Sequence, residues 1–164
     1  MLVYRIVHKK YSKTLFVSGM EGRWNSKGNK VLYCAESIAL AFLENMIRRQ
    51  GVGFKDDFKI MIIEVPTKAG ITFFNIENLE TGWRNSDNYS KCQKAGDEWY
   101  IACKHLLLKV PSAVLPESYN FVINTDHPGY KKIKLINVTN LVPDKRIEEI
   151  LKTFPKKQKL QYHK

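Results

Sequence analysis

The chain has 164 residues, of which 44% are hydrophobic and 12% aromatic, so the composition fits one globular domain with a packed core and excludes a disordered chain. The 27 basic and 16 acidic residues give a formal net charge of +11, which favours an anionic partner or ligand: nucleic acid, an acidic protein or a phosphate-bearing small molecule. No apolar run is long enough to span a bilayer, and the first residues lack the layout of a signal peptide. We therefore expect an intracellular, cytoplasmic protein.

The first half of the chain predicts three strands and one helix. The strands are expected at residues 2–7, 31–34 and 58–65, the last being a buried run that ends at Pro66. Residues 18–30 (SGMEGRWNSKGNK) predict a loop because they are rich in Gly, Asn and Ser. Ser37 is suited to cap a helix over Ile38–Arg49, with Gly51 as its C-terminal stop.

The second half predicts four strands and two helices. Strands are expected at residues 71–76, 106–114, 119–124 and 132–138, the second of them broken at Pro111. The polar segment 78–96 predicts a long loop and is the expected place for a lid. Helices are expected at 97–107 and 144–154, and residues 156–164 form a basic tail that we expect to be solvated. Strands and helices mix without regular alternation, which favours an α+β domain with a mixed sheet and flanking helices.

Cysteines and metal motifs give no sign of a reactive centre. The three cysteines, Cys34, Cys92 and Cys103, are scattered and form no C-x-x-C pair, so we expect reduced, mostly buried thiols. The sequence has no Walker loop, no G-x-G-x-x-G, no H-E-x-x-H and no zinc-ligand spacing. We expect neither a metal site nor a bound cofactor.

Glu44 is a carboxylate in an otherwise apolar helix. Its neighbours three and four residues away include Leu40, Ala41 and Ile47, and Arg48 stands at the fourth position after it. The pattern leaves two interpretations open. Glu44 is either a surface residue paired with Arg48 or a partly buried carboxylate at the edge of a cleft.

Two arginines and two aromatic residues are further candidates. The guanidinium of Arg23 stands in a Gly-rich loop, where it is suited to grip a phosphate or a carboxylate, although it can also stack on Trp24 without any ligand. Tyr33 closes the second strand, and the usual role of such a residue is a core aromatic. Arg5 lies on the first strand, where an inward-facing arginine requires an anionic partner and an outward-facing one requires none.

Ser112 and two asparagines lie in the last third of the chain. A serine between prolines ordinarily makes a turn, and no G-x-S-x-G context surrounds Ser112, so we reject a serine hydrolase. Asn120 and Asn124 lie at the two ends of a strand and can cap it.

Eight short motifs occur in one order: YRIV, GRWNSKG, VLYCAES, IALAFLE, GDEW, VPSAVLP, YNFVIN and HP. Taken together they resemble the RES domain, a family named for an arginine, a glutamate and a serine. The resemblance runs from Tyr4 to about Val142; each motif alone is weak, but eight in order are strong. The chain departs from the usual pattern at Glu21, where glycine is common, and at Thr125, where proline is common, which affects loop geometry rather than a reacting group.

The resemblance implies a single RES domain over residues 1–164, with a fold similar to the catalytic core of ADP-ribosyltransferases of the diphtheria-toxin kind. It implies a toxin of a bacterial RES–Xre type II toxin–antitoxin pair, which inhibits growth by cleaving the nicotinamide–ribose bond of NAD. NAD is then a substrate and no cofactor is needed. The expected partner is an Xre-type helix-turn-helix antitoxin, and we expect no membrane and no nucleic acid contact except through that antitoxin.

The resemblance also assigns site residues. It places Glu44, Arg23 and Tyr33 at the central catalytic positions. The residues it implies for the rest of the NAD pocket are Arg5, Trp24, Ser112 and an asparagine, Asn120 or Asn124, of which we expect Asn124. A carboxylate stabilises the oxocarbenium-like ribosyl cation that forms when nicotinamide leaves, while arginines neutralise the pyrophosphate and a tyrosine stacks on the nicotinamide.

Three other functions remain open at this point. A transferase that attaches ADP-ribose to a macromolecule would share the same NAD pocket. An RNA-directed toxin would suit the charge of +11, but the four histidines form no visible pair. In a non-catalytic binding module, Glu44 would be a surface ion pair. The sequence also leaves open whether water or phosphate accepts the ribosyl group.

Overall fold

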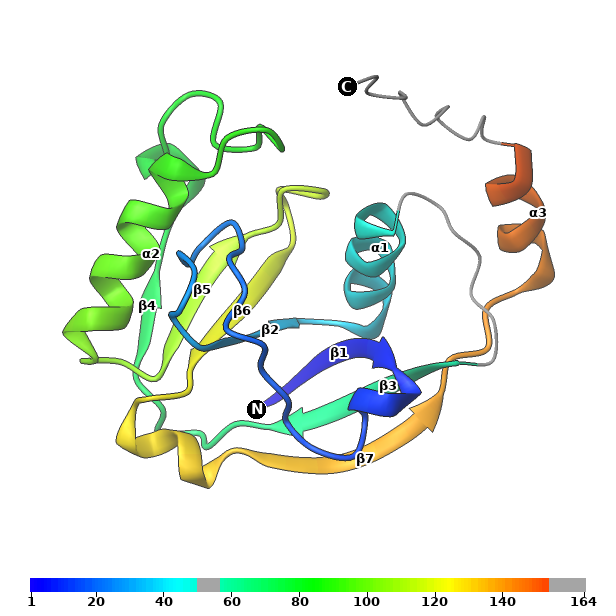
Figure 1. Cartoon of the computed structure of the whole chain (residues 1–164), viewed down its shortest axis with the longest axis horizontal. Helices are drawn as coiled ribbons and strands as arrows, with labels where there is room; N and C mark the ends of the chain where they lie inside the picture. The colour runs from blue at the N-terminus through cyan, green and yellow to red at the C-terminus, as the bar shows by residue number, and fades with distance from the viewer. Residues whose placement is uncertain (50–56, 154–164) are drawn as a thin grey trace, which may run out of the picture.

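A seven-stranded mixed sheet forms the centre of the molecule (Figure 1). The computed structural model describes residues 1–49 and 57–153, and within them the strand order is β4-β5-β6-β2-β1-β3-β7. The pair β4–β5 is parallel and the other neighbouring strands are antiparallel. Three α-helices accompany the sheet in this part of the chain, so the α+β class expected from the sequence is confirmed.

The predicted strands are all present, with small changes in length. Their bounds are β1 Leu2–His8, β2 Val31–Ala35, β3 Phe58–Glu64, β4 Ile71–Phe73, β5 Leu107–Pro111, β6 Tyr119–Asn124 and β7 Lys134–Asn140. The fourth is shorter than expected, although the N–H of Phe74 still donates to the carbonyl of Lys109 at 3.0 Å. Short 3-10 helices lie at η1 Lys9–Tyr11, η2 Ile76–Asn78 and η3 Pro128–Lys132.

The first helix forms as predicted. Helix α1 spans Ile38–Arg48, and the hydroxyl of Ser37 accepts a hydrogen bond from the N–H of Leu40 at 3.1 Å, which satisfies one of the free donors at the helix start. Leu40 and Ala41 are buried against the sheet. The expected stop at Gly51 lies outside the described residues.

The second helix begins earlier than predicted. Helix α2 spans Ser90–Ala102, so the expected bounds of 97–107 are wrong at both ends and the loop of 78–96 is shorter than expected. Its buried residues are Cys92, Gly96 and Trp99, which are spaced as on one face of a helix. This spacing was hard to recognise in the sequence because one of the three is a glycine and the residues between them are polar. The helix ends because Cys103 takes a left-handed conformation with φ of 48°.

The closing helix is present as α3, Lys145–Thr153, in agreement with the prediction of 144–154. The basic tail at 156–164 lies outside the described residues. In the part of the chain that the structure describes, no helix is both long and apolar enough to cross a membrane.

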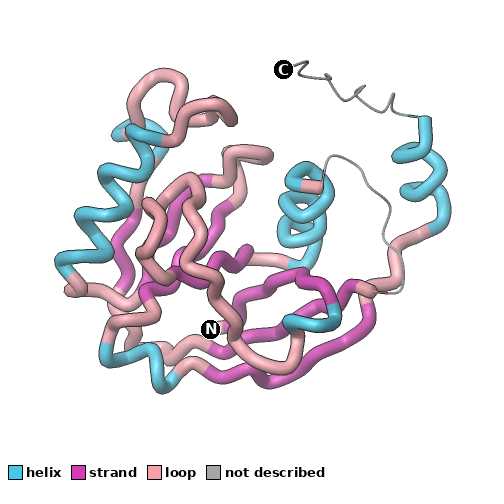
Figure 2. Tube along the Cα trace, viewed as in Figure 1, coloured by secondary structure: helices cyan, strands magenta, loops and turns pink. Residues whose placement is uncertain are grey.

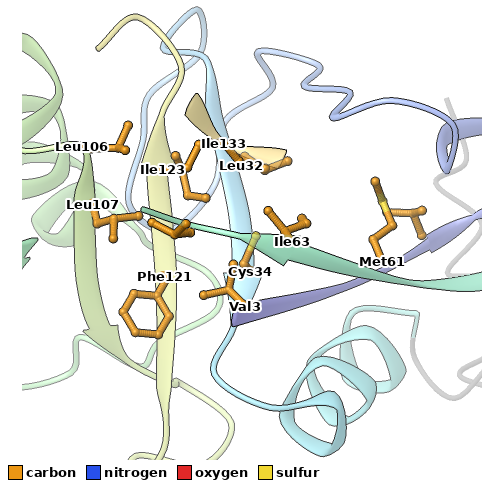
Figure 3. Close-up of a cluster of buried hydrophobic side chains, with 12 residues drawn as sticks. Val3, Leu32, Cys34, Met61, Ile63, Leu106, Leu107, Phe121, Ile123 and Ile133 are labelled. Atoms are coloured by element: carbon orange, nitrogen blue, oxygen red, sulfur yellow. The ribbon is translucent and has the colours of Figure 1, made fainter. Parts of the chain in front are cut away.

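Apolar side chains cover both faces of the sheet. One face carries Leu32 and Cys34 of β2 and packs against Leu15 and Val17 of the long loop before β2; we call it the loop face (Figures 2 and 3). The other face carries the alternate residues of β2. Because successive side chains of a strand point to opposite sides, this second face, the helical face, packs against both α1 and α2.

Each helix covers its own part of the helical face. Helix α1 packs Leu40 and Ala41 against Ile6 and Ala35. Helix α2 packs Trp99 and Cys92 against β5 and β6, with the loop residue Trp24 in the same cluster. Figure 1 shows the turn between β5 and β6 lying between α1 and the segment that leads into α2. This arrangement brings side chains from three distant parts of the chain to one place.

Candidate active site

Glu44 lies in the middle of α1, on the side that meets the turn after β5. Its Oε1 atom accepts hydrogen bonds from the hydroxyl of Ser112 at 2.7 Å and from Nδ2 of Asn120 at 2.6 Å. The side chain is only partly buried. Among the residues that the structure describes, no ion pair joins Glu44 to Arg48. The contacts of Glu44 therefore fit an oriented carboxylate better than a surface ion pair.

Ser112 has a fully buried side chain that orients Glu44. Its Oγ accepts hydrogen bonds from the N–H groups of Val114 at 3.1 Å and Leu115 at 3.0 Å, and its exposed fraction is 0%. Two backbone donors occupy the lone pairs of the hydroxyl, so its hydrogen points to Glu44. The hydroxyl of Ser112 thus has three partners and no exposed surface, so its contacts are all within the protein.

Of the two candidate asparagines, Asn120 is the one beside Glu44. Asn124 lies four residues further along β6, roughly 13 Å away for an extended strand. It is fully buried and bonds elsewhere: Nδ2 donates to the carbonyl of Tyr100 at 2.9 Å and Oδ1 accepts from the N–H of Asp126 at 2.9 Å. The structure therefore places Asn120, and not the expected Asn124, beside Glu44, while Asn124 is bonded to the end of α2.

The strand register explains why Asn120 faces Glu44. Ala35 is paired with Tyr4 on one side and with Asn120 on the other. Directly paired residues of antiparallel strands point to the same face, so Tyr4, Ala35 and Asn120 form a row on the helical face beneath α1. Tyr4 is packed against the α1 cluster. Sequence reasoning did not select Tyr4. The alternation of side chains along the strand already indicated that Tyr4 and Arg5 face opposite sides of the sheet.

Arg5 points to the opposite side of the sheet from Glu44. Its strand neighbours Val3 and Val7 belong to the cluster of the loop face, and its Nη1 donates to the carbonyl of Phe16 at 3.0 Å. Burial lowers the pKa of Arg5. The structure does not bring Arg5 together with Glu44, because alternation along β1 separates them by the thickness of the sheet.

Arg23 holds the segment that leads into α2. Its Nη1 donates to the carbonyl of Trp83 and, at 3.1 Å, to that of Asn85, and its Nη2 donates to the carbonyl of Arg84 at 3.2 Å. The guanidinium also lies over the ring of Tyr89, 4.6 Å from its centre. Three of the five N–H donors of this guanidinium, which was expected to grip a phosphate, are thus used on three consecutive carbonyls.

Trp24 and Tyr33 support the loop that carries Arg23. Trp24 is 3% exposed and belongs to the α2 cluster. The hydroxyl of Tyr33 donates to Oδ1 of Asn25 at 2.8 Å and accepts from the N–H of Trp24 at 2.9 Å. Burial of the hydroxyl raises the pKa of Tyr33. Tyr33 lies on the helical face, two residues before Ala35, and its hydroxyl is committed to the loop.

Helix α2 binds this loop through hydrogen bonds and close packing of residues that sequence reasoning did not select. Asp97 Oδ1 accepts from the N–H of Ser26 at 2.9 Å and from Nδ2 of Asn29 at 2.6 Å. Gly96 touches the loop so closely that an added Cβ would lie 2.0 Å from the carbonyl oxygen of Trp24. The motif GDEW contained both residues, but only the packed structure shows what they contact.

Two pockets lie on the α2 side of the helical face. One, of about 100 Å³, is lined by Trp24 and by residues of the segment before α2, including Leu79 and Trp83. The other, of about 270 Å³, lies between α2 and β4. Neither is lined by Glu44, so the candidate site is assigned from its hydrogen bonds. Among residues 1–49 and 57–153, no group of three or more His, Cys, Asp or Glu side chains could hold a metal ion.

Comparisons with known proteins show which family the chain resembles. A family model described as the RES domain matches residues 2–145. The protein "Toxin Res" of Yersinia enterocolitica is 30% identical over 135 residues, which cover 80% of this chain and 88% of that protein. The "Prs ADP-ribosylating toxin" of a Sphingobium species is 34% identical over 128 residues, which cover 77% of this chain and 80% of that protein.

A solved structure shares the fold. A chain in the crystal structure of the M. tuberculosis MbcT–MbcA toxin–antitoxin complex superposes with a TM-score of 0.70, covering 93% of this chain and 89% of that one. The sequence identity is 18%, so this likeness shows the fold alone. The family resemblance expected from the eight motifs is confirmed by the match over residues 2–145.

Proposed function

The chain belongs to the RES domain family, and on that premise we propose that it is a toxin that breaks the nicotinamide–ribose bond of NAD with Glu44 as its catalytic carboxylate. The observation that carries this proposal is the pair of hydrogen bonds, at 2.7 and 2.6 Å, from Ser112 and Asn120 to one oxygen of Glu44. Both donors reach Oε1, so they fix the orientation of the carboxylate and direct Oε2 away from them.

The chemistry needs an oriented negative charge. In the proposed reaction the bond between C1′ of the ribose and the nicotinamide nitrogen breaks, and its electron pair neutralises the pyridinium ring. The ribosyl group becomes oxocarbenium-like, and a nearby carboxylate stabilises it. One positioned group of this kind lowers the barrier by about 3–4 kcal/mol. Water, which then loses a proton, or inorganic phosphate completes the reaction by bonding to C1′.

The neighbouring residues act on Glu44 and on the loops around it. Ser112 and Asn120 are positioning residues, because their hydrogen bonds end on the carboxylate. In this proposal Tyr33 and Trp24 hold the 22–29 loop, and Arg23 fixes the segment before α2 next to the site. We also propose that the fold is a variant of the ADP-ribosyltransferase catalytic core.

A second candidate function is transfer of ADP-ribose to a macromolecule. The observation that favours it is the name of the Sphingobium relative, an ADP-ribosylating toxin 34% identical to this chain. The bond broken and the role of Glu44 are the same in both candidates. They differ in the acceptor, which is water or phosphate in one and a nucleophilic group of a macromolecule in the other.

We further propose that an antitoxin protein of the Xre-type, with a helix-turn-helix domain, neutralises this chain. Support comes from the shared fold with a chain of the MbcT–MbcA toxin–antitoxin complex. An enzyme that destroys NAD in the cytoplasm harms its own cell and so requires an inhibitor. The net charge of +11 favours fast capture by an acidic segment of that partner.

The test is to incubate the purified chain with NAD in buffers with and without phosphate and to identify the products by mass spectrometry. Release of nicotinamide with ADP-ribose supports hydrolysis, and release with a phosphorylated ADP-ribose supports phosphorolysis. Addition of a bacterial lysate with labelled NAD reveals any transfer to a macromolecule. If NAD stays intact under all three conditions, the proposed function is wrong.

A further inference from the structure

We propose that Arg84 binds the pyrophosphate of the dinucleotide substrate, an assignment that rests on the proposed function. No motif in the sequence marks Arg84. The residue lies in the segment between β4 and α2, which the sequence predicts as a lid, and its side chain is exposed. Three observations together place its guanidinium at the turn whose Ser112 binds Glu44, with most of its donors open.

The first observation is that the backbone around Arg84 is held firmly. Trp83, its neighbour, is 9% exposed and packs in the α2 cluster. The carbonyls of Trp83, Arg84 and Asn85 all accept hydrogen bonds from Arg23. A backbone fixed in this way holds the Cα atom of Arg84 in one place and so limits where its side chain can reach.

The second observation is where Arg84 points. Its Nε donates to the carbonyl of Ala113 at 2.8 Å. Ala113 follows Ser112, whose hydroxyl donates to Glu44. The guanidinium of Arg84 therefore lies at the turn after β5, one residue from the group that orients the catalytic carboxylate. Figure 1 shows the turn between β5 and β6 lying between α1 and the segment that carries Arg84.

The third observation is the number of donors left. A guanidinium has five N–H donors in a planar fork that matches two phosphate oxygens, and the hydrogen bond to Ala113 uses the one on Nε. In the part of the chain that the structure describes, Arg84 takes part in no ion pair. Its two terminal amino groups can therefore receive an anion without breaking the contact that positions them.

The other two candidate arginines are less suited to this role. Arg23 already uses three of its five donors on carbonyls, and Arg5 lies on the loop face of the sheet, opposite Glu44. In the proposed function Glu44 contacts the ribose at C1′. The pyrophosphate is attached to C5′ of the same ribose and therefore lies one sugar away from Glu44. Arg84 lies at the turn beside this position, through its hydrogen bond to Ala113.

The experiment measures binding and cleavage in Arg84→Ala and Arg84→Lys, with Arg146→Ala as a matched control. Arg146 is also an exposed arginine, but it stands in α3 and pairs with Asp144. Calorimetry with ADP-ribose tests binding of the pyrophosphate directly. Steady-state kinetics compare NAD with nicotinamide riboside, which has the same scissile bond and no phosphate.

We expect Arg84→Ala to weaken ADP-ribose binding and to raise KM for NAD by roughly tenfold, since a hydrogen bond to a charged group contributes on this scale. Arg84→Lys should retain part of the affinity, and Arg146→Ala should match the parent. The kinetics of nicotinamide riboside should change less than twofold. A merely structural role of Arg84 would slow both substrates equally.

The outcome for Arg84 is separable from that for the proposed function. Unchanged ADP-ribose affinity in Arg84→Ala overturns the assignment even if the parent cleaves NAD. Equal losses with NAD and nicotinamide riboside overturn it as well. Failure of the parent to cleave NAD contradicts the proposed reaction, but the calorimetry with ADP-ribose still decides whether Arg84 binds a pyrophosphate.

Discussion

Glu44 in α1 and Ser112 after β5 are joined by a 2.7 Å hydrogen bond although 68 residues separate them in the chain. Glu44 accepts a second hydrogen bond from Asn120, 76 residues away. The hydroxyl of Ser112 is itself fixed by two backbone N–H groups. The candidate site is therefore a carboxylate whose direction is set by a rigid turn, which is the preorganisation that electrostatic catalysis requires.

The first prediction concerns the charge of Glu44. Glu44→Gln retains an oxygen that can accept from Ser112 and Asn120, so the fold should be kept. NAD cleavage should fall by roughly 100- to 1,000-fold, because an amide cannot stabilise the ribosyl cation as a carboxylate does. Glu36→Gln is the control, since Glu36 is exposed and only accepts from the N–H of Tyr119. Near-parental cleavage by Glu44→Gln would remove Glu44 from the mechanism.

The second prediction separates the two asparagines. Asn120→Ala should lower kcat for NAD and change the unfolding temperature little, since Asn120 is partly exposed and acts on Glu44. Asn124→Ala should instead lower stability by about 1–3 kcal/mol, because it removes a fully buried amide and leaves the carbonyl of Tyr100 without this donor. Thermal unfolding and kinetics on the same preparations check both. A kcat loss confined to Asn124→Ala would restore Asn124 to the site.

The third prediction concerns the link between Arg23 and the segment before α2. Arg23→Ala removes the donors for three carbonyls, so amide hydrogen exchange in residues 81–89 should become faster. KM for NAD should rise, because Arg84 is no longer held beside Ser112. Lys27→Ala in the same loop is the control, since Lys27 is exposed. Unchanged exchange in 81–89 would show that this segment does not depend on Arg23.

The fourth prediction concerns the contact between α2 and the 22–29 loop. Gly96→Ala would place a methyl group 2.0 Å from the carbonyl oxygen of Trp24, so helix and loop must separate. Overpacking of this kind costs about 1–3 kcal/mol, and unfolding in denaturant should show a loss of that size. Lys94→Ala, on the exposed side of the same helix, should leave stability unchanged. Equal stability of Gly96→Ala and the parent would contradict this packing.

The fifth prediction concerns the proposed antitoxin. If its C-terminal part covers the mouth of the site near Arg23 and Arg84, inhibition should compete with NAD and weaken as salt is raised. The measurement is a titration of antitoxin against NAD cleavage at several NAD and salt concentrations. Inhibition that does not depend on NAD concentration would exclude blocking of the site. Inhibition that does not depend on salt would exclude the electrostatic part.

Local signals in the sequence determined the elements and the family. Alternation in β1 and the buried run of β3 predicted those strands, and Ser37 predicted the start of α1, because strand period and helix capping are properties of neighbouring residues. Helix α2 was predicted with the wrong bounds, since one of its buried positions is a glycine and the sequence therefore lacks an apolar residue there. The order of eight short motifs was enough to predict the RES domain.

Only the tertiary structure decided which side chains meet. The choice of Asn120 over Asn124 follows from the register of β6 against β2, and a register depends on the partner strand, not on the strand alone. The face of Arg5 follows from which side of the sheet α1 covers. Arg23 is engaged by carbonyls 60 to 62 residues away. Contacts across such separations form only when the sheet and its helices pack, so a sequence can propose residues for a site but the packed fold selects among them.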